Sequence, residues 1–153
     1  AEEYVEQFLD VILSKNIKII ETTSINEETM KYILQLFSKY NRITIHKCHT
    51  IKNALLAQKY GATIISLDGF ESAGYSGGIS KITNLTLLSL ASKYLNTPYI
   101  CSGGIVNGKQ LASIMCLGAE GCKLGTRFMC TIESPVNNAV KEMIANNKNE
   151  DNT

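Results

Sequence analysis

Apolar residues recur along the chain with two alternating patterns, a helical period of 3.6 residues and the short apolar runs of strands. Val5, Phe8, Leu9 and Ile12 share one face of a helix predicted over residues 3–14. The same period predicts further helices over about 27–37, 51–60, 83–95, 108–117 and 135–145. Short apolar runs predict strands over about 17–22, 43–48, 63–67, 99–102 and 121–124, of which 17–22 is expected to be buried.

Capping residues mark several helix ends. Asn26 can cap a helix whose first turn holds Glu27 and Glu28, and carboxylates suit the positive end of the helix dipole. Gly61 and Gly118 follow two predicted helices at the position where a left-handed residue usually ends them.

Strands and helices alternate, which indicates an α/β fold with a parallel sheet and right-handed crossovers. A doubly wound sheet and part of a (β/α)8 TIM barrel both fit this order. A complete barrel needs about 250 residues, whereas this chain has 153 and about five βα units. The second architecture would therefore be an incomplete barrel with exposed sheet edges.

Composition narrows the class of protein. With 44% hydrophobic residues the chain can form a core, and its formal net charge of +1 gives no basis for binding nucleic acid or an anionic membrane. Its five cysteines form no Cys-x-x-Cys pair, so we expect reduced thiols, a cytoplasmic location and no metal site. We expect one domain over 1–145, a disordered polar tail over 146–153 and, because residue 1 is Ala, a missing N-terminal part.

Two glycine turns follow the last two predicted strands. Gly103-Gly104 and Gly125-Thr126 allow backbone N–H groups to approach an anion closely, and Thr126 adds a hydroxyl. Loops after the last two strands of a barrel frequently bind phosphate. Tight strand-to-helix turns would explain the same glycines without a ligand, but their occurrence at consecutive strand ends favours a phosphate site.

Three other features are candidates for a role in binding or catalysis. Asp68 begins a glycine-rich loop, DGFESAGYSGG over 68–78, at a strand end where barrel enzymes place functional side chains. Lys47 ends an apolar strand, and either a ligand or a salt bridge to Asp68 or Glu71 would satisfy its charge. His46 and His49 flank Lys47 and are interpreted as structural rather than as general bases.

Asn84-Leu85-Thr86 matches a glycosylation acceptor. Since no secretory signal accompanies it, we interpret the match as chance.

The runs DGFESAGYSGG at 68–78 and PYICSGGIVNGKQLASIMCLGAEGCKLGTRFMCTIESP at 98–135 resemble nitronate monooxygenases, formerly called 2-nitropropane dioxygenases. The resemblance extends upstream through IHKCHTIKNALLAQKYGA at 45–62 and IKIIETTS at 17–24. It implies an FMN-dependent (β/α)8 barrel that oxidises alkyl nitronates with O2 to a carbonyl compound and nitrite. The chain would correspond to strands four to eight of that barrel.

The resemblance also implies roles for individual residues. Gly103, Gly104, Gly125 and Thr126 would bind the FMN phosphate. The isoalloxazine ring would lie near Asp68, Ala73 and Gly74, and Lys47 would place its charge near the flavin N1 edge.

Two positions depart from the family pattern. Tyr75 stands where members have a histidine proposed as the base for neutral nitroalkanes, and a tyrosine with an ordinary pKa of about 10 is a poor base near neutral pH. We therefore expect nitronates, which are already deprotonated, to react more readily than nitroalkanes. Lys123 replaces a neutral amide in the strand that leads to the phosphate turn, and the resemblance places it among the cofactor-binding residues.

Other functions fit the same resemblance. A flavin-dependent enoyl-acyl-carrier-protein reductase shares the barrel and the Gly-Thr-Arg-Phe element and would require NAD(P)H. A catalytically silent flavin-binding barrel and a barrel that binds another phosphate-bearing ligand are further alternatives. The exposed edges of a partial barrel also make a homo-oligomer plausible.

Overall fold

The computed structural model describes residues 2–72 and 81–146. Five parallel strands form one sheet in the order β1-β2-β3-β4-β5. They span Ile19–Thr23, Ile43–Cys48, Ile64–Asp68, Tyr99–Ser102 and Cys122–Lys123. Because each strand pairs with the next one along the chain, the sheet has the strand order of a (β/α)8 barrel and not that of a doubly wound sheet.

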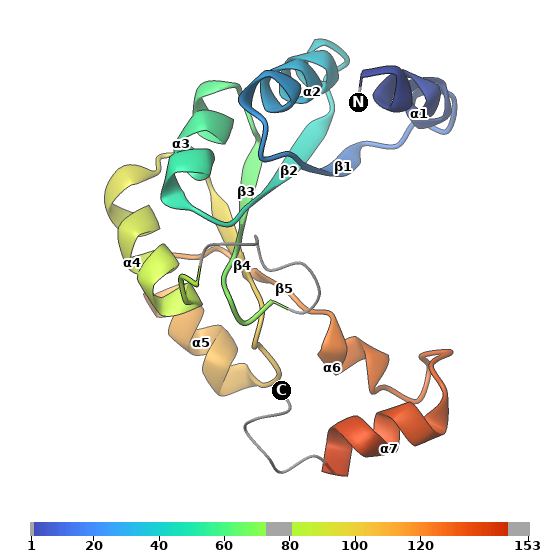
Figure 1. Ribbon diagram of the computed structural model, residues 1–153, viewed down its shortest axis with the longest axis vertical. Helices are drawn as coiled ribbons and strands as arrows, with labels where there is room; N and C mark the ends of the chain where they lie inside the picture. Colours follow the sequence, from blue (N-terminus) through green and yellow to red (C-terminus); the bar gives the residue numbers. More distant parts are fainter. Residues whose placement is uncertain (1, 73–80, 147–153) are drawn as a thin grey trace.

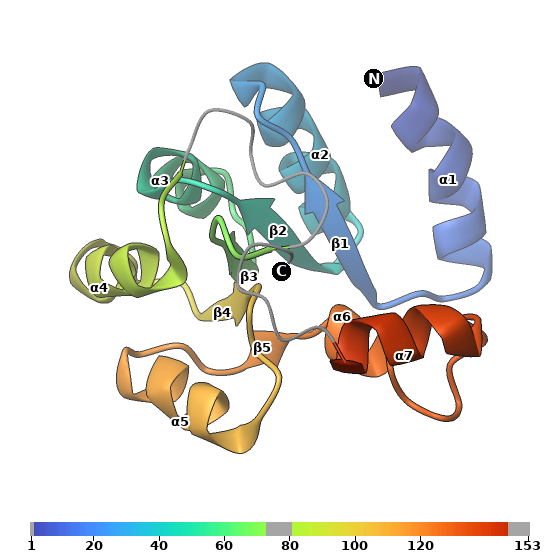
Figure 2. The same cartoon turned by 60° about the horizontal axis from the view of Figure 1, so that its bottom comes forward.

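The helices alternate with the strands, beginning with a helix ahead of β1 and ending with two helices after β5. They are α1 (Glu2–Ser14), α2 (Glu27–Lys39), α3 (Ile51–Lys59), α4 (Asn84–Tyr94), α5 (Gly108–Cys116), α6 (Thr126–Met129) and α7 (Asn138–Asn146). Helices α2 to α5 lie along the outside of the curved sheet (Figure 1). The view in Figure 2 shows the helices from α1 to α5 as an arc around the strands. The molecule is therefore an incomplete (β/α)8 barrel, as the sequence predicted.

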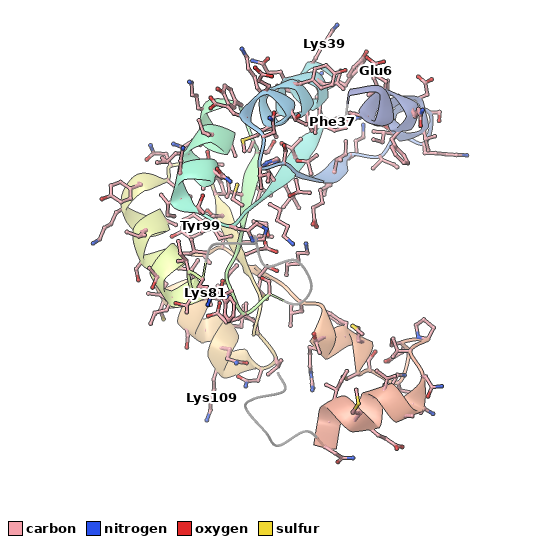
Figure 3. The ribbon with its side chains drawn as sticks, in the orientation of Figure 1. Glu6, Phe37, Lys39, Lys81, Tyr99 and Lys109 are labelled. Carbon is pink, nitrogen blue, oxygen red and sulfur yellow. The ribbon has the colours of Figure 1, made fainter. Side chains whose placement is uncertain are left out.

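The hydrophobic core lies between the sheet and the outer helices. Ile65, Leu67 and Cys101 on the strands are fully buried against Leu34 of α2 and Leu88 of α4. Phe37, which Figure 3 labels on α2, is 3% exposed. Burying such side chains contributes about 1.5–3 kcal/mol each, so this outer face stabilises the sheet.

Left-handed residues end four helices. After α3, Gly61 has φ +90°, and the N–H of Ala62 donates to the carbonyl of Ala57 at 2.9 Å. Gly118 has φ +92° after α5, where the N–H of Ala119 donates to Ile114 at 3.1 Å. Asn16 and Asn41 take the same position after α1 and α2. Each helix thus ends in a Schellman motif, and the predicted stops at Gly61 and Gly118 are confirmed.

The first strand differs from its prediction. We expected a buried strand over 17–22, but β1 lies at the sheet edge, and Ile19 is 56% exposed. Only Thr22 of this strand is buried. The expectation of burial was wrong because an apolar strand at the edge of an incomplete barrel has a neighbour on one side only.

Two further features concern membrane-spanning helices and the predicted polar tail. No helix within 2–72 and 81–146 has the length and apolar character needed to cross a membrane. Apart from Asn146, which ends α7, the predicted polar tail at 146–153 lies outside the described residues.

Candidate functional site

Polar side chains line the inner face of the curved sheet, opposite the face that the helices cover. Strand pairing places Lys47 beside Ser66, Asp68 beside Ser102, and Ser102 beside Lys123. Because residues paired in a parallel sheet project to the same side, these side chains share one face near the carboxyl ends of the strands. Barrel enzymes build their active sites at this end.

Lys47 and Asp68 form an ion pair at the centre of this inner face. The Lys47 Nζ atom lies 3.1 Å from Asp68 Oδ2, and the aspartate side chain is 1% exposed. The hydroxyl of the buried Ser66 donates to Asp68 Oδ1 at 2.7 Å. The salt bridge that the sequence left open as an alternative to a ligand is therefore present, and the lysine side chain keeps 21% exposure.

Both histidines beside Lys47 contact protein groups. His46 Nδ1 lies 2.8 Å from Thr22 Oγ1, and burial lowers the pKa of His46 below its ordinary value. His49 Nδ1 lies 2.9 Å from the backbone oxygen of Asp68. His49 therefore connects the loop after β2 to the end of β3, which agrees with the structural interpretation of both residues.

Lys123 has a carboxylate partner from the opposite edge of the sheet. Its Nζ atom bonds Glu21 Oε1 at 2.5 Å, between the last strand and the first. The positive charge of Lys123, which departs from the family pattern, is thus paired with Glu21 of the same chain. The cofactor role of Lys123 stays a prediction.

The Gly103-Gly104 turn has a conformation that favours glycine. Gly103 has φ +102°, and a Cβ there would lie 2.5 Å from the backbone nitrogen of Ser72. Gly104 has φ +67°, and its Cβ would meet Glu71 Cβ at 3.2 Å. The loop after β3 therefore packs closely against one side of this turn, and that packing explains both glycines.

Gly125 is different, since no heavy atom of residues 2–72 and 81–146 lies within 4 Å of the place where its Cβ would be. It precedes α6, a four-residue helix that begins at Thr126 and was not predicted. A short extra helix after the last strand is where phosphate-binding barrels frequently place the anion. Packing among the described residues gives no reason for glycine at 125, which leaves room there for a ligand.

Asn84 is a residue whose role sequence reasoning missed. It is 8% exposed, and its Oδ1 accepts from the N–H of Gly69 at 2.8 Å. Its Nδ2 donates to the carbonyls of Ser102 and Gly103 at 3.0 and 2.8 Å. A buried amide with this many bonds is no surface glycosylation acceptor, and the chance interpretation of Asn84-Leu85-Thr86 agrees with the structure. No sequence signal marked its contacts.

The structure does not describe three of the predicted site residues. Ala73, Gly74 and Tyr75 lie outside the described residues. Among the residues that are described, no three His, Cys, Asp or Glu side chains gather in a way that could hold a metal ion.

The fold and site define an incomplete (β/α)8 barrel with a charged inner face and two glycine turns at the carboxyl ends of its last strands. The family model for nitronate monooxygenase matches residues 2–153, and the chain belongs to that family. A probable nitronate monooxygenase of Staphylococcus saprophyticus is 26% identical over an alignment of 152 positions, which covers 94% of this chain and 42% of that protein.

Two solved structures show the same fold. FabK from Thermotoga maritima superimposes with a TM-score of 0.82 at 25% identity, over 93% of this chain and 44% of that one. Nitroalkane oxidase from Streptomyces ansochromogenes gives a TM-score of 0.74 at 23% identity, over 91% of this chain and 42% of the other. The chain thus spans less than half the length of these relatives.

Proposed function

We propose that this chain supplies the flavin-binding half of an FMN-dependent nitronate monooxygenase, which oxidises alkyl nitronates with O2. The observation that carries the proposal is the Lys47–Asp68 ion pair on the inner face, where Asp68 pairs with Ser102, the last residue of the strand that leads to the Gly103-Gly104 turn. A flavin ring over this face would meet the partly exposed Lys47 ammonium. FMN would supply the redox chemistry when bound.

The donor set of the two turns suits a phosphate. Gly125 has open space on its Cα, and the N–H groups of Thr126 and Arg127 have no acceptor among residues 2–72 and 81–146. The N–H groups of Gly104 and Ile105 are likewise unbonded in the described part of the chain. Ser102 pairs with Lys123, so the two glycine turns follow neighbouring strands of the sheet.

Each charged or polar side chain of the inner face has a proposed role in binding the flavin. Lys47 would place positive charge at the edge of a flavin ring, and Asp68 would hold the ammonium in place. The buried Ser66 hydroxyl fixes the orientation of Asp68 in turn. Tyr75 is proposed to orient the substrate by a hydrogen bond and not to remove a proton.

The test begins with a visible spectrum of the purified protein and identification of any released flavin. Bound FMN, followed by O2 consumption with an alkyl nitronate and much slower turnover of the neutral nitroalkane, would support the proposal. Lys47→Met should weaken FMN binding and change its reduction potential, whereas Lys52→Met on α3 is the matched control. A colourless protein that takes up no added FMN would reject the proposal.

The structural comparisons favour one further candidate within the same family. FabK superimposes with a higher TM-score than nitroalkane oxidase, so the fold alone does not select one reaction. A flavin-dependent enoyl-acyl-carrier-protein reductase would reduce its flavin rapidly with NAD(P)H. Stopped-flow mixing with NADH and NADPH separates the two, since the proposed oxidation of nitronates requires neither.

A further inference from the structure

We propose that Asn84 is a positioning residue that aims the backbone N–H groups of the Gly103-Gly104 turn at an anion. The proposal rests on the proposed function, because the anion it concerns is the phosphate of FMN. Asn84 lies at the first position of α4, and the hydrogen bonds of its side chain reach backbone groups of Gly69, Ser102 and Gly103.

The peptide units of the turn are held by their carbonyl oxygens. The Ser102 carbonyl accepts from the Ser72 hydroxyl and from Asn84 Nδ2, both at 3.0 Å. The Gly103 carbonyl accepts from Asn84 Nδ2 at 2.8 Å, and the Gly104 carbonyl accepts from Gln110 Nε2 at 2.8 Å. Three successive carbonyls thus point toward amide or hydroxyl side chains.

A trans peptide unit carries its N–H antiparallel to its carbonyl. The described residues contain no cis peptide bond. The N–H groups of Gly103, Gly104 and Ile105 therefore point away from the side chains that hold the carbonyls. Pairing of Ser102 with Lys123 in the parallel ladder directs the Gly103 N–H to β5, whereas the N–H groups of Gly104 and Ile105 donate no hydrogen bond within 2–72 and 81–146 and are open to an anion.

Asn84 is itself fixed from two sides. Its Oδ1 accepts from Gly69 at the start of the loop after β3, and its backbone N–H donates to both carboxylate oxygens of Glu71 at 3.1 and 3.0 Å. One buried side chain therefore couples the loop after β3 to the turn after β4. Without Asn84 the Gly103 carbonyl would lose the hydrogen bond that orients this glycine peptide in the described part of the chain.

The experiment compares FMN with riboflavin, which has the same ring and no phosphate. Asn84→Ala should weaken FMN binding about tenfold and leave riboflavin binding within about twofold, since one oriented hydrogen-bond set is lost. Asn96→Ala, an exposed asparagine just after α4, is the control and should change neither. Gln110→Ala loosens the Gly104 carbonyl and the capping box of α5, leaves the Ser102 and Gly103 carbonyls bonded to Asn84, and should give a smaller loss in the same direction.

The outcomes separate this proposal from the proposed function. An Asn84→Ala protein that keeps the wild-type ratio of FMN to riboflavin affinity, or weakens both equally, overturns the positioning role. If the wild type binds no flavin, the proposed function fails, and inorganic phosphate titrated against the Gly104 and Ile105 amide NMR signals decides the role of Asn84. Wild-type shifts that Asn84→Ala abolishes support it, and unmoved wild-type signals reject it. If Asn84→Ala does not fold, Gln110→Ala carries the same comparison.

Discussion

Lys123 on the last strand forms an ion pair with Glu21 on the first strand, 102 residues earlier in the chain. The two strands are the opposite edges of the five-stranded sheet. Both side chains project to its inner face, so their attraction draws the edges toward one another across the concave side. With side chains 36% and 47% exposed, the pair is only partly shielded from water.

Reversing the charges of this pair tests its contribution to stability. Glu21→Lys or Lys123→Glu alone should lower the free energy of unfolding by repulsion, and the double exchange should restore most of it. The coupling energy of the double-mutant cycle is expected at about 0.2–1 kcal/mol, as for other exposed pairs. Urea unfolding in low salt and in about 1 M NaCl provides the measurement, since salt screens exposed charges. Equal coupling at both salt concentrations would contradict the ion-pair account.

Gly61 and Gly118 offer a matched comparison between backbone strain and crowding. Both have φ near +90° at the end of a helix, but a Cβ at Gly61 meets no described atom within 4 Å, whereas one at Gly118 lies 2.3 Å from the Tyr99 hydroxyl oxygen. Gly61→Ala should cost about 1–2 kcal/mol from the left-handed backbone alone. Gly118→Ala should cost more, as measured by urea unfolding.

Removing the Tyr99 hydroxyl checks the cause of that difference. Tyr99 lies on β4 (Figure 3), and its hydroxyl donates to the Leu117 carbonyl at 3.0 Å. Tyr99→Phe alone should lose about 1 kcal/mol with this bond. In the Gly118→Ala background it should be neutral or stabilising, because it removes the crowded atom. A Tyr99→Phe effect that is the same in both backgrounds would show that the hydroxyl does not clash.

Local chemistry explains which parts of the fold were predictable. The helix ends at Gly61 and Gly118 and the cap at Asn26, whose Oδ1 accepts from the Thr29 N–H at 2.9 Å, depend on neighbours in the sequence. The exposure of Ile19 depends on what lies beside β1 in space, which an apolar run does not record. Helix α6 has four residues, too few for a 3.6-residue period to be detected.

The candidate site divides in the same way. Lys47 and Asp68 were predicted as site residues because each ends a strand, and their salt bridge stood among the alternatives. The partner of Lys123 and the bonds of Asn84 join residues that are far apart in sequence, and no local pattern encodes such pairs. The charges and the glycine spacing thus predicted which residues belong to the candidate site, whereas the contacts between them could be found only from the fold.

Cysteine reactivity should follow burial. Burial raises the pKa of Cys48 and of Cys101 to about 12, and the negative charge of Asp68 adds to the effect at Cys48. Because the thiolate is the nucleophile, both residues should resist iodoacetamide at pH 8 in the native protein, whereas the exposed Cys116 should be alkylated first. Mass spectrometry of tryptic peptides identifies the modified sites. In about 6 M guanidinium chloride all of them should react; early native modification of Cys48 would contradict the buried position.

The buried His46 should make stability depend on pH near neutrality. Burial lowers its pKa below the ordinary 6.5, an effect that the backbone of Ser24 partly opposes. Between the lowered folded pKa and 6.5 the unfolded chain binds more protons than the folded one, so stability is complete above 6.5 and falls as the pH decreases. Unfolding by urea at several pH values between about 8 and 5.5 should show this loss, at most about 1.4 kcal/mol per pH unit. His46→Asn, which keeps a polar atom near Thr22, should flatten the dependence in this window, while His49→Asn should retain it. A wild-type stability that is constant from pH 8 to about 5.5 would mean that burial does not perturb His46.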